Sequence, residues 1–275
     1  MVALLAAGCR VGHAPSPTEQ PVASTEATEE AVAAPEAPDA PPRPRPDPTA
    51  TADPLAAVEP APAPITPCAP VIIVGARGSG QPVGAGAEVR DTAAQLTAIA
   101  GEGTVATEAV VYDASPIGVA LFNPQAFAAG VAVAARALRA QTSALQQRCP
   151  DSRIVWMGFS QGALVVRDAM ADIPEPAQAG VSAVVLMGDP DRAPGDPANR
   201  GTIPPTTGAP PGSRQRPLPP AWTPVSTTWC LQGDPFCDAD AGDLGEGLAL
   251  HAVGYREQGL TQQAAVELAG LLGLS

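Results

Sequence analysis

Residues 153–166 read RIVWMGFSQGALVV and place a serine between two glycines at the end of an apolar run. The run Ile154–Met157 is typical of a short strand that is buried on both faces of a sheet. The apolar residues that follow the second glycine predict a helix. Strand, sharp turn and helix form the context in which the pattern G-x-S-x-G, here Gly158–Gly162, acts as a nucleophile elbow with Ser160 at its tip. A chance match in a chain with 27 glycines is the alternative, so the rest of the sequence has to decide.

The chain before residue 67 differs in composition from the chain after it. Residues 10–66 contain 14 prolines and few large apolar residues. Such a segment cannot bury enough surface to offset its conformational entropy. We therefore expect residues 10–66 to be a disordered tether and residues 67–275 to be one folded domain, which is long enough for a single α/β core.

Charge and composition exclude several classes of function. The net charge is −13, and no basic patch or stripe appears, so we expect no nucleic-acid partner. The sequence contains no lysine, which excludes a P-loop lysine, a Schiff-base lysine and a Ser-Lys dyad. One histidine in the expected domain, His251, leaves too few ligands for metal catalysis, so we expect neither a metal nor another cofactor.

Residues 1–10 read MVALLAAGCR, an apolar run too short to span a bilayer, which needs about 20 residues. The run resembles the lipobox of bacterial lipoproteins, in which the cysteine is acylated after signal cleavage, although position −3 is Ala6 instead of the usual Leu. We expect residues 1–9 to be a signal remnant and Cys9 to carry a lipid anchor. The protein would then be exported and held at the membrane in the cell envelope. A start that is simply trimmed is the alternative.

Four further cysteines fall in the expected domain. An even number of cysteines in an exported domain suggests two disulfides, and four cysteines allow three pairings. Cys230 and Cys237 are close enough in sequence to close a small loop, which leaves Cys68 to pair with Cys149. The alternative is four free thiols in a reducing compartment.

Strand and helix patterns alternate along the expected domain. Strands are predicted at 71–75, 107–112, 154–157, 181–187 and 225–230, and helices at 87–100, 126–147, after the elbow and at 261–273, with an irregular Pro-rich stretch at 202–220. This alternation predicts a mostly parallel sheet covered on both faces, a three-layer α/β/α sandwich. Ligands of such sheets lie beyond the carboxyl ends of the strands, where Ser160, the loop 75–82 and Asp234 all fall.

A serine nucleophile needs a general base, usually a histidine that a carboxylate holds. His13 lies in the expected tether, so a Ser-His mechanism has to use His251. The resulting order Ser, acid, His is that of α/β-hydrolases. Asp189 and Asp234 both follow strands in Gly-Asp-Pro turns. We favour Asp234 because the loop Cys230–Cys237 would hold it stiffly, whereas Asp189 more simply closes a turn.

The negative charge that develops on an attacked carbonyl oxygen needs hydrogen-bond donors. The backbone N–H of Gln161, directly after the nucleophile, supplies one. We expect the loop Arg77–Gly80 to supply the second. Nucleotide binding is the rival interpretation of this loop, but the spacing of Gly75, Gly78 and Gly80 does not match G-x-G-x-x-G.

Four stretches now resemble one family: CAPVIIVGARGSGQP, CPDSRIVWMGFSQGA, CLQGDPFC and HAVGY, in this order across 67–275. They are similar to the cutinase family, including the cutinase-like proteins of mycolic-acid-containing actinobacteria. The resemblance implies a lidless α/β-hydrolase of cutinase type, a serine hydrolase of lipid or polyester-type esters. By motif position it implies Ser160 as nucleophile, Asp234 as acid and His251 as base. It also implies Ser79 and Gln161 as the oxyanion hole, and both disulfides as paired above.

The sequence departs from the family at three places, one of which is the Pro-rich segment 202–220, which is enlarged. The family often has Thr-Gly-Glu-Pro where this chain has residues 79–82, a mild change if the backbone donates. The stretch between Cys237 and His251 is long and acidic, with Asp238, Asp240, Asp243 and Glu246, and we expect this stretch to line the substrate cleft together with residues 114–125. Alternative functions are a carbohydrate-ester deacetylase of acetylxylan type and a catalytically silent envelope-binding module. We expect a monomer.

Overall fold

The computed structural model describes residues 67–274. The expectations for the signal, the Cys9 anchor and the tether therefore lie outside the described residues. The strands are β1 (Val71–Ala76), β2 (Val105–Ala109), β3 (Arg153–Phe159), β4 (Val181–Met187), β5 (Asn199–Gly201) and β6 (Ser226–Cys230). The helices are α1 (Ala87–Ala100), α2 (Ile117–Phe122), α3 (Pro124–Arg148), α4 (Gln161–Ala171), α5 (Pro176–Ala179), α6 (Leu244–Glu257) and α7 (Leu260–Leu272), with the 3₁₀ turn η1 (Thr223–Val225).

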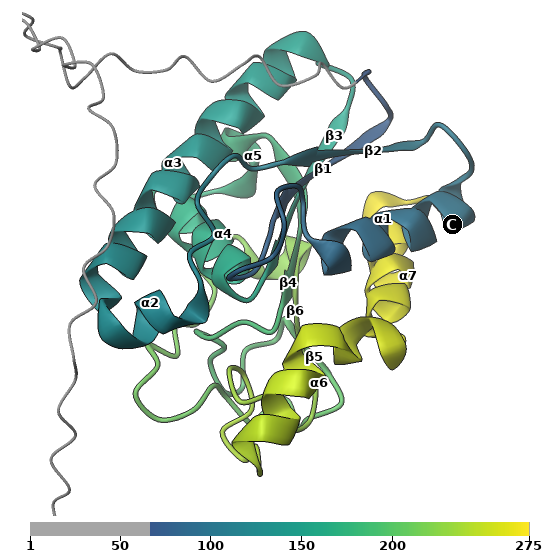
Figure 1. Ribbon diagram of the computed structural model, residues 1–275. Helices are drawn as coiled ribbons and strands as arrows, with labels where there is room; N and C mark the ends of the chain where they lie inside the picture. The colour runs from purple at the N-terminus through teal and green to yellow at the C-terminus, as the bar shows by residue number, and fades with distance from the viewer. Residues whose placement is uncertain (1–66, 275) are drawn as a thin grey trace, which may run out of the picture. The chain divides into compact units, whose positions relative to one another are not determined.

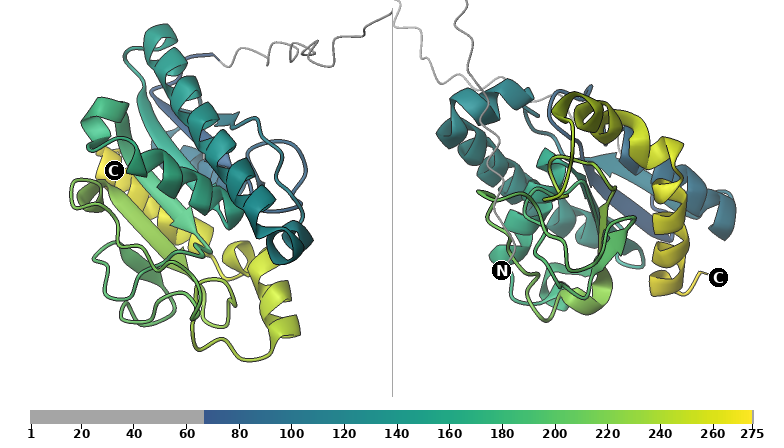
Figure 2. Two further views of the ribbon diagram at one scale, coloured as in Figure 1. Left: turned by 90° about the vertical axis from the view of Figure 1, so that its left-hand side faces the viewer. Right: turned by 90° about the horizontal axis from the view of Figure 1, so that it is seen from below.

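All six strands form one parallel sheet in the order β2-β1-β3-β4-β6-β5. Helices α1 and α7 cover one face, and α3 and α4 cover the other (Figures 1 and 2). This arrangement confirms the predicted three-layer α/β/α fold. The carboxyl ends of β1, β3, β4 and β6 meet at one edge of the sheet, because the strands are parallel.

Each face of the sheet packs against its own apolar layer. On the α3 and α4 side, the ring of Trp156 from β3 stacks on that of Trp222, with 5.5 Å between ring centroids, and both side chains are fully buried. On the α1 and α7 side, alternate residues of β1 and β3, such as Ile73 and Val155, pack against helix residues such as Leu268. Burial on both faces explains why the strand sequences are continuous apolar runs.

The structure differs from the predicted elements in the bounds of β2 and in several elements that were not predicted. Strand β2 lies at Val105–Ala109, so it begins two residues and ends three residues before the predicted 107–112, because the chain leaves the sheet so that Tyr112 reaches the backbone oxygen of Arg77. Helices α2, α5 and α6, the 3₁₀ turn η1 and the short strand β5 were not predicted. The Pro-rich stretch 202–220 is irregular, as predicted.

The structure forms the two expected disulfides, Cys68–Cys149 and Cys230–Cys237. The first joins the residue just before β1 to the junction of α3 and β3, and the second closes the loop after β6. Disulfides persist in oxidising compartments, so these two bonds indicate an extracytoplasmic protein. Within residues 67–274, no helix is both long and apolar enough to span a bilayer.

Candidate active site

The turn between β3 and α4 is a strained nucleophile elbow. Ser160 has φ 55° and ψ −116°, a backbone conformation that L-residues rarely adopt and that costs of order 1–3 kcal/mol. Both flanking glycines are required by close backbone approaches. A Cβ at Gly158 would lie 2.3 Å from the oxygen of Gly162, and a Cβ at Gly162 would lie 1.9 Å from the oxygen of Ala76. The two glycines of the pattern are therefore needed because the start of α4 packs directly against the backbone at the ends of β3 and β1.

The carboxylate of Asp234 is fully buried in the loop that the Cys230–Cys237 disulfide closes after β6. Its Oδ1 accepts a hydrogen bond from the N–H of Phe236 at 2.9 Å. Its Oδ2 lies 2.8 Å from Nδ1 of His251. Asp234 therefore orients the imidazole of His251 and leaves the other ring nitrogen to face the reaction.

His251 lies on α6 and is held between aromatic rings. Its ring stacks on that of Phe159 with centroids 4.7 Å apart, and the Phe236 ring lies 4.4 Å away. A Cβ at Gly188 would come within 2.8 Å of its Cε1, so a larger residue there would displace the ring. His251 and Ser160 line the same cavity. The structure thus brings together the three residues that the sequence predicted: Ser160, Asp234 and His251.

Tyr255 is part of this cluster, although the sequence analysis did not single it out. Its hydroxyl donates to Oδ2 of Asp234 at 2.6 Å and accepts a hydrogen bond from the N–H of Leu231 at 3.3 Å. Burial, and then the nearby Asp234 carboxylate, raise the pKa of Tyr255 well above its ordinary value. The signal available in the sequence was its spacing of four residues from His251, which places both side chains on one face of a helix.

Ser79 and Gln161, the expected oxyanion-hole residues, lie side by side and line a cavity with Ser160. The Ser79 hydroxyl donates to Oε1 of Gln161 at 3.0 Å. As the first residue of α4, Gln161 has a backbone N–H without an intrahelical partner. In the loop 78–81, the N–H groups of all residues except Ser79 donate to protein acceptors among the described residues. Two backbone donors are thus available beside Ser160.

Asp189, the alternative candidate for the catalytic acid, binds other groups. Its Oδ2 lies 2.6 Å from the guanidinium of Arg167, and its Oδ1 accepts from the N–H of Asp191 at 3.0 Å. Asp189 therefore closes a turn and neutralises a buried arginine, and it has no role beside the imidazole.

The stretch between Cys237 and His251 lines the cleft through Leu248, but its acidic side chains do not. Asp238 is buried and accepts hydrogen bonds from the N–H groups of Gly233 and Asp240, and Asp243 caps α6 by accepting from Glu246. Aspartate side chains in loops and at helix starts accept hydrogen bonds from nearby backbone N–H groups, and in this way they close turns and cap helices. None of the four acidic residues, Asp238, Asp240, Asp243 and Glu246, lines the two cavities beside Ser160. Residues 114–125 do contribute, through Ile117, Ala120 and Leu121.

Two cavities border Ser160. One has a volume of about 480 Å³ and is walled by apolar residues of α2, by α3 and by residues 210–213. The other has a volume of about 190 Å³ and is lined by His251, Phe159 and Leu248 among others. No group of three or more His, Cys, Asp or Glu side chains suited to hold a metal occurs in the part of the chain that the structure describes.

A family model and two named relatives show the family of this chain. The sequence model of the Cutinase family matches residues 67–269. The chain is 30% identical over 206 residues to "Carboxylesterase Culp1" of Mycobacterium tuberculosis, covering 75% of this chain and 83% of that protein. It is 31% identical over 125 residues to "Cutinase pbc1" of Pyrenopeziza brassicae, covering 45% of this chain and 58% of that protein, which is less than two thirds of its length.

Solved structures share the fold of this chain. A cutinase-like protein from Cryptococcus sp. aligns with a TM-score of 0.62 and 23% identity, covering 75% of this chain and 96% of that chain. The catalytic core domain of acetyl xylan esterase from Trichoderma reesei aligns with a TM-score of 0.56 and 25% identity, covering 76% and 100% of the respective chains. The family match spans the described domain almost completely, from the first disulfide to the last helix. The chain therefore belongs to the cutinase family of carboxylic ester hydrolases.

Proposed function

We propose that this chain is an exported serine esterase that hydrolyses lipid or polyester-type esters with the triad Ser160, His251 and Asp234. The observation that carries the proposal is the 2.8 Å contact between Asp234 and His251, on a ring that lines one cavity with Ser160. This is the arrangement that a Ser-His-Asp mechanism requires.

The reaction follows from the roles of these three groups. Oγ of Ser160 attacks the ester carbonyl carbon while Nε2 of His251 takes the hydroxyl proton. The resulting imidazolium is stabilised by the buried carboxylate of Asp234. When the tetrahedral intermediate collapses, His251 gives that proton to the leaving alcohol, and Ser160 is left as an acyl ester. Water then attacks the acyl ester with His251 again acting as base, which releases the acid and restores the hydroxyl.

The oxyanion of the tetrahedral intermediate is stabilised by the backbone N–H groups of Gln161 and Ser79. The side chains of these residues hold the two donors in place through the 3.0 Å hydrogen bond between them. Donors that are fixed before the reaction need no reorganisation when charge develops, and each is worth about 10²–10³ in kcat.

The test is hydrolysis of p-nitrophenyl butyrate by the purified chain and by its Ser160→Ala variant. We expect the variant to keep its circular dichroism spectrum and to lose at least about a thousandfold in kcat, since the nucleophile is removed. Substantial turnover by a folded variant would refute the mechanism. Stoichiometric labelling of Ser160 by a fluorophosphonate probe would separate an active esterase from a silent binding module.

A carbohydrate-ester deacetylase is the second candidate, because the chain aligns with an acetyl xylan esterase over 76% of its length. The apolar walls of the larger cavity favour an acyl chain over a sugar. Release of acetate from acetylated xylan at a rate above that for p-nitrophenyl butyrate would reverse this order.

The arrangement of the whole chain is part of the proposal. A folded domain at 67–275 would be tethered through residues 10–66 to a lipid on Cys9. Labelling with a fatty-acid analogue tests the anchor: incorporation should disappear in Cys9→Ala, and equal incorporation in both proteins would exclude acylation at this residue.

A further inference from the structure

Only one of the two cavities beside Ser160 is lined by the catalytic base, His251. His251 lines the smaller one, of about 190 Å³, and is absent from the lining of the larger one, of about 480 Å³. In the proposed mechanism His251 gives its proton to the leaving alcohol oxygen, so the alcohol has to lie on the side of His251. The acyl chain, on the opposite side of the scissile bond, then points into the larger cavity.

The larger cavity does not end near Ser160. It shares five lining residues with a further cavity of about 400 Å³, namely Phe127, Leu164, Pro190, Gly212 and Ser213. The two cavities therefore adjoin, and together they make up what we call the groove between α3 and residues 210–214, which begins at Ser160. Its walls are apolar close to Ser160, and its far end is bordered by Asp168, Asp191 and Arg214.

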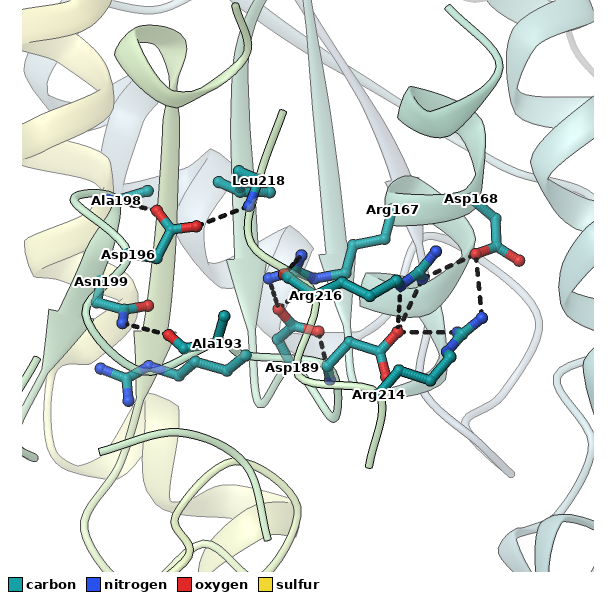
Figure 3. A network of polar contacts seen from close by, with 12 residues as sticks. Arg167, Asp168, Asp189, Ala193, Asp196, Ala198, Asn199, Arg214, Arg216 and Leu218 are labelled. Carbon is teal, nitrogen blue, oxygen red and sulfur yellow. Dashed lines mark hydrogen bonds and ion pairs between the residues drawn. The ribbon is translucent and has the colours of Figure 1, made fainter. Parts of the chain in front are cut away.

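One wall of this groove is the Pro-rich stretch, which ion pairs hold in place. The guanidinium of Arg216 lies 2.8 Å from Asp168 of α4 and 2.8 Å from Asp191 of the turn after β4. Arg214 lies 2.9 Å from Asp191, and Arg167 donates to the backbone oxygen of Arg216 at 2.6 Å. Figure 3 shows Arg214 and Arg216 converging on Asp168.

This network anchors the chain directly after residues 210–213, which belong to no helix or strand. Prolines at 210 and 211 further restrict the backbone there. A wall that is fixed before substrate binds lowers the cost of ordering it on binding. The Pro-rich stretch therefore forms a fixed wall of the groove before any substrate binds.

We infer that the groove between α3 and residues 210–214 is the acyl-chain subsite, and that the preferred substrates are long-chain acyl esters of small alcohols. The inference rests on the proposed function and adds the substrate class to it. A short acyl chain leaves the distal cavity to water, whereas a long chain displaces that water and buries apolar surface on both walls. We expect kcat/KM to rise about tenfold or more from butyrate to dodecanoate.

The distal cavity offers a test that leaves the catalytic groups untouched. Ala128, an exposed residue of α3, lines the distal cavity and neither cavity beside Ser160, and its neighbour Ala129 is also exposed and lines none of the three. Ala128→Trp should fill the distal groove, and Ala129→Trp is the matched control. The assay is kcat/KM on p-nitrophenyl esters from acetate to palmitate, at concentrations below substrate aggregation.

We expect Ala128→Trp to lower kcat/KM about tenfold for dodecanoate and longer esters, and to leave acetate and butyrate within twofold of wild type. Ala129→Trp should leave the whole series unchanged. A long-chain profile of Ala128→Trp that matches wild type, or an equal loss at every chain length at an unchanged Tm, would overturn the inference. If the long-chain profile of Ala128→Trp matches wild type, Ser160-dependent turnover of short esters would still support the proposed function. Turnover that is the same in Ser160→Ala would instead refute the proposed function itself.

The assignment of the two sides has its own test. With dodecanoate as the fixed acyl group, the methyl ester should be hydrolysed faster than the dodecyl ester, since the alcohol faces the smaller cavity. With acetate as the acyl group and dodecanol as the alcohol, turnover should be slow. Faster turnover of dodecyl acetate than of methyl dodecanoate would reverse the assignment.

Discussion

The hydroxyl of Tyr255 donates to the same carboxylate oxygen of Asp234, at 2.6 Å, that lies 2.8 Å from Nδ1 of His251. One oxygen thus serves two donors, and the tyrosine stabilises the charged carboxylate that orients the base. Burial raises the pKa of Tyr255 well above its ordinary value, so its hydroxyl stays protonated and keeps donating at neutral pH.

Tyr255→Phe removes this donor while keeping the ring. Oδ2 of Asp234 would then lose the 2.6 Å hydrogen bond from Tyr255 and keep only its contact with Nδ1 of His251. We expect kcat to fall about tenfold at an unchanged KM, because the carboxylate that orients the base is held less firmly. A kcat within twofold of wild type at an unchanged Tm would show that this hydroxyl does not help to position Asp234.

Stability at high pH should depend on the two tyrosines. The chain has no lysine, and burial raises the pKa of both Tyr112 and Tyr255 above the ordinary value. The folded state therefore keeps two protons that the unfolded chain releases above about pH 10, so stability is complete below that pH and falls as the pH rises. Each tyrosine should lower the free energy of unfolding by about 1.4 kcal/mol per pH unit.

Urea unfolding between pH 8 and 11 measures this slope. Tyr112→Phe and Tyr255→Phe should each remove about half of it, because phenylalanine does not titrate. A slope that survives in the double variant would assign alkaline unfolding to other groups.

The two disulfides should contribute to different properties. Residues 230 and 237 are separated by 7 positions, and residues 68 and 149 by 81. Loop-closure entropy gives about 2.5 kcal/mol for the short loop and about 4.5 kcal/mol for the long one. Replacing Cys68 and Cys149 by alanine should therefore cost more stability than replacing Cys230 and Cys237.

Activity should follow the opposite order, because the short loop carries Asp234. Assayed well below the Tm of each variant, the Cys230→Ala/Cys237→Ala protein should lose most of its kcat, whereas the Cys68→Ala/Cys149→Ala protein should keep most of it. Equal losses of kcat in the two double variants would contradict a positioning role for the short disulfide.

Arg167 should be essential for stability, since it neutralises Asp189 in the interior. The Asp189 side chain is 0% exposed and the Arg167 side chain 4% exposed. Arg167→Met leaves a buried carboxylate without its partner, and we expect a loss of about 3–5 kcal/mol in the free energy of unfolding. Arg139→Met is the control, because its partner Asp172 is 66% exposed and the exposed pair is worth at most about 1 kcal/mol. Similar losses in the two variants would show that the buried pair contributes no more to stability than the exposed one.

Much of the site could be predicted because the local sequence is consistent with the fold. A buried apolar strand followed by G-x-S-x-G leaves few conformations other than the elbow, and α1 was predicted with the bounds that the structure has, Ala87–Ala100. The cysteine pair on either side of Asp234 likewise marked the loop that carries the acid.

Helix α6 could not be predicted from propensity, although it carries His251. Its glycines weaken a helix in isolation by about 1 kcal/mol each. They are needed for tertiary reasons: a Cβ at Gly247 would lie 2.7 Å from the oxygen of Gly233, and a Cβ at Gly254 would lie 2.6 Å from the side chain of Leu231. The same residues that obscure the helix in the sequence allow it to approach the Asp234 loop.

The role of the Pro-rich stretch also depended on the fold. Its arginines are far in sequence from their partners on α4, for example Arg216 from Asp168, so no local pattern reveals the pairing. Only the crossover from β4 to β6 brings this segment back beside α3 and α4.

The Cys68–Cys149 bond has a mechanical consequence. β1 lies between β2 and β3 in the sheet, and Cys68 precedes it by three residues. A pulling force on the chain ahead of Cys68 would otherwise peel β1 from its neighbours one hydrogen bond at a time. With the disulfide in place, the force passes through a covalent bond into the junction of α3 and β3, so the strand that leads to Ser79 stays in register under tension.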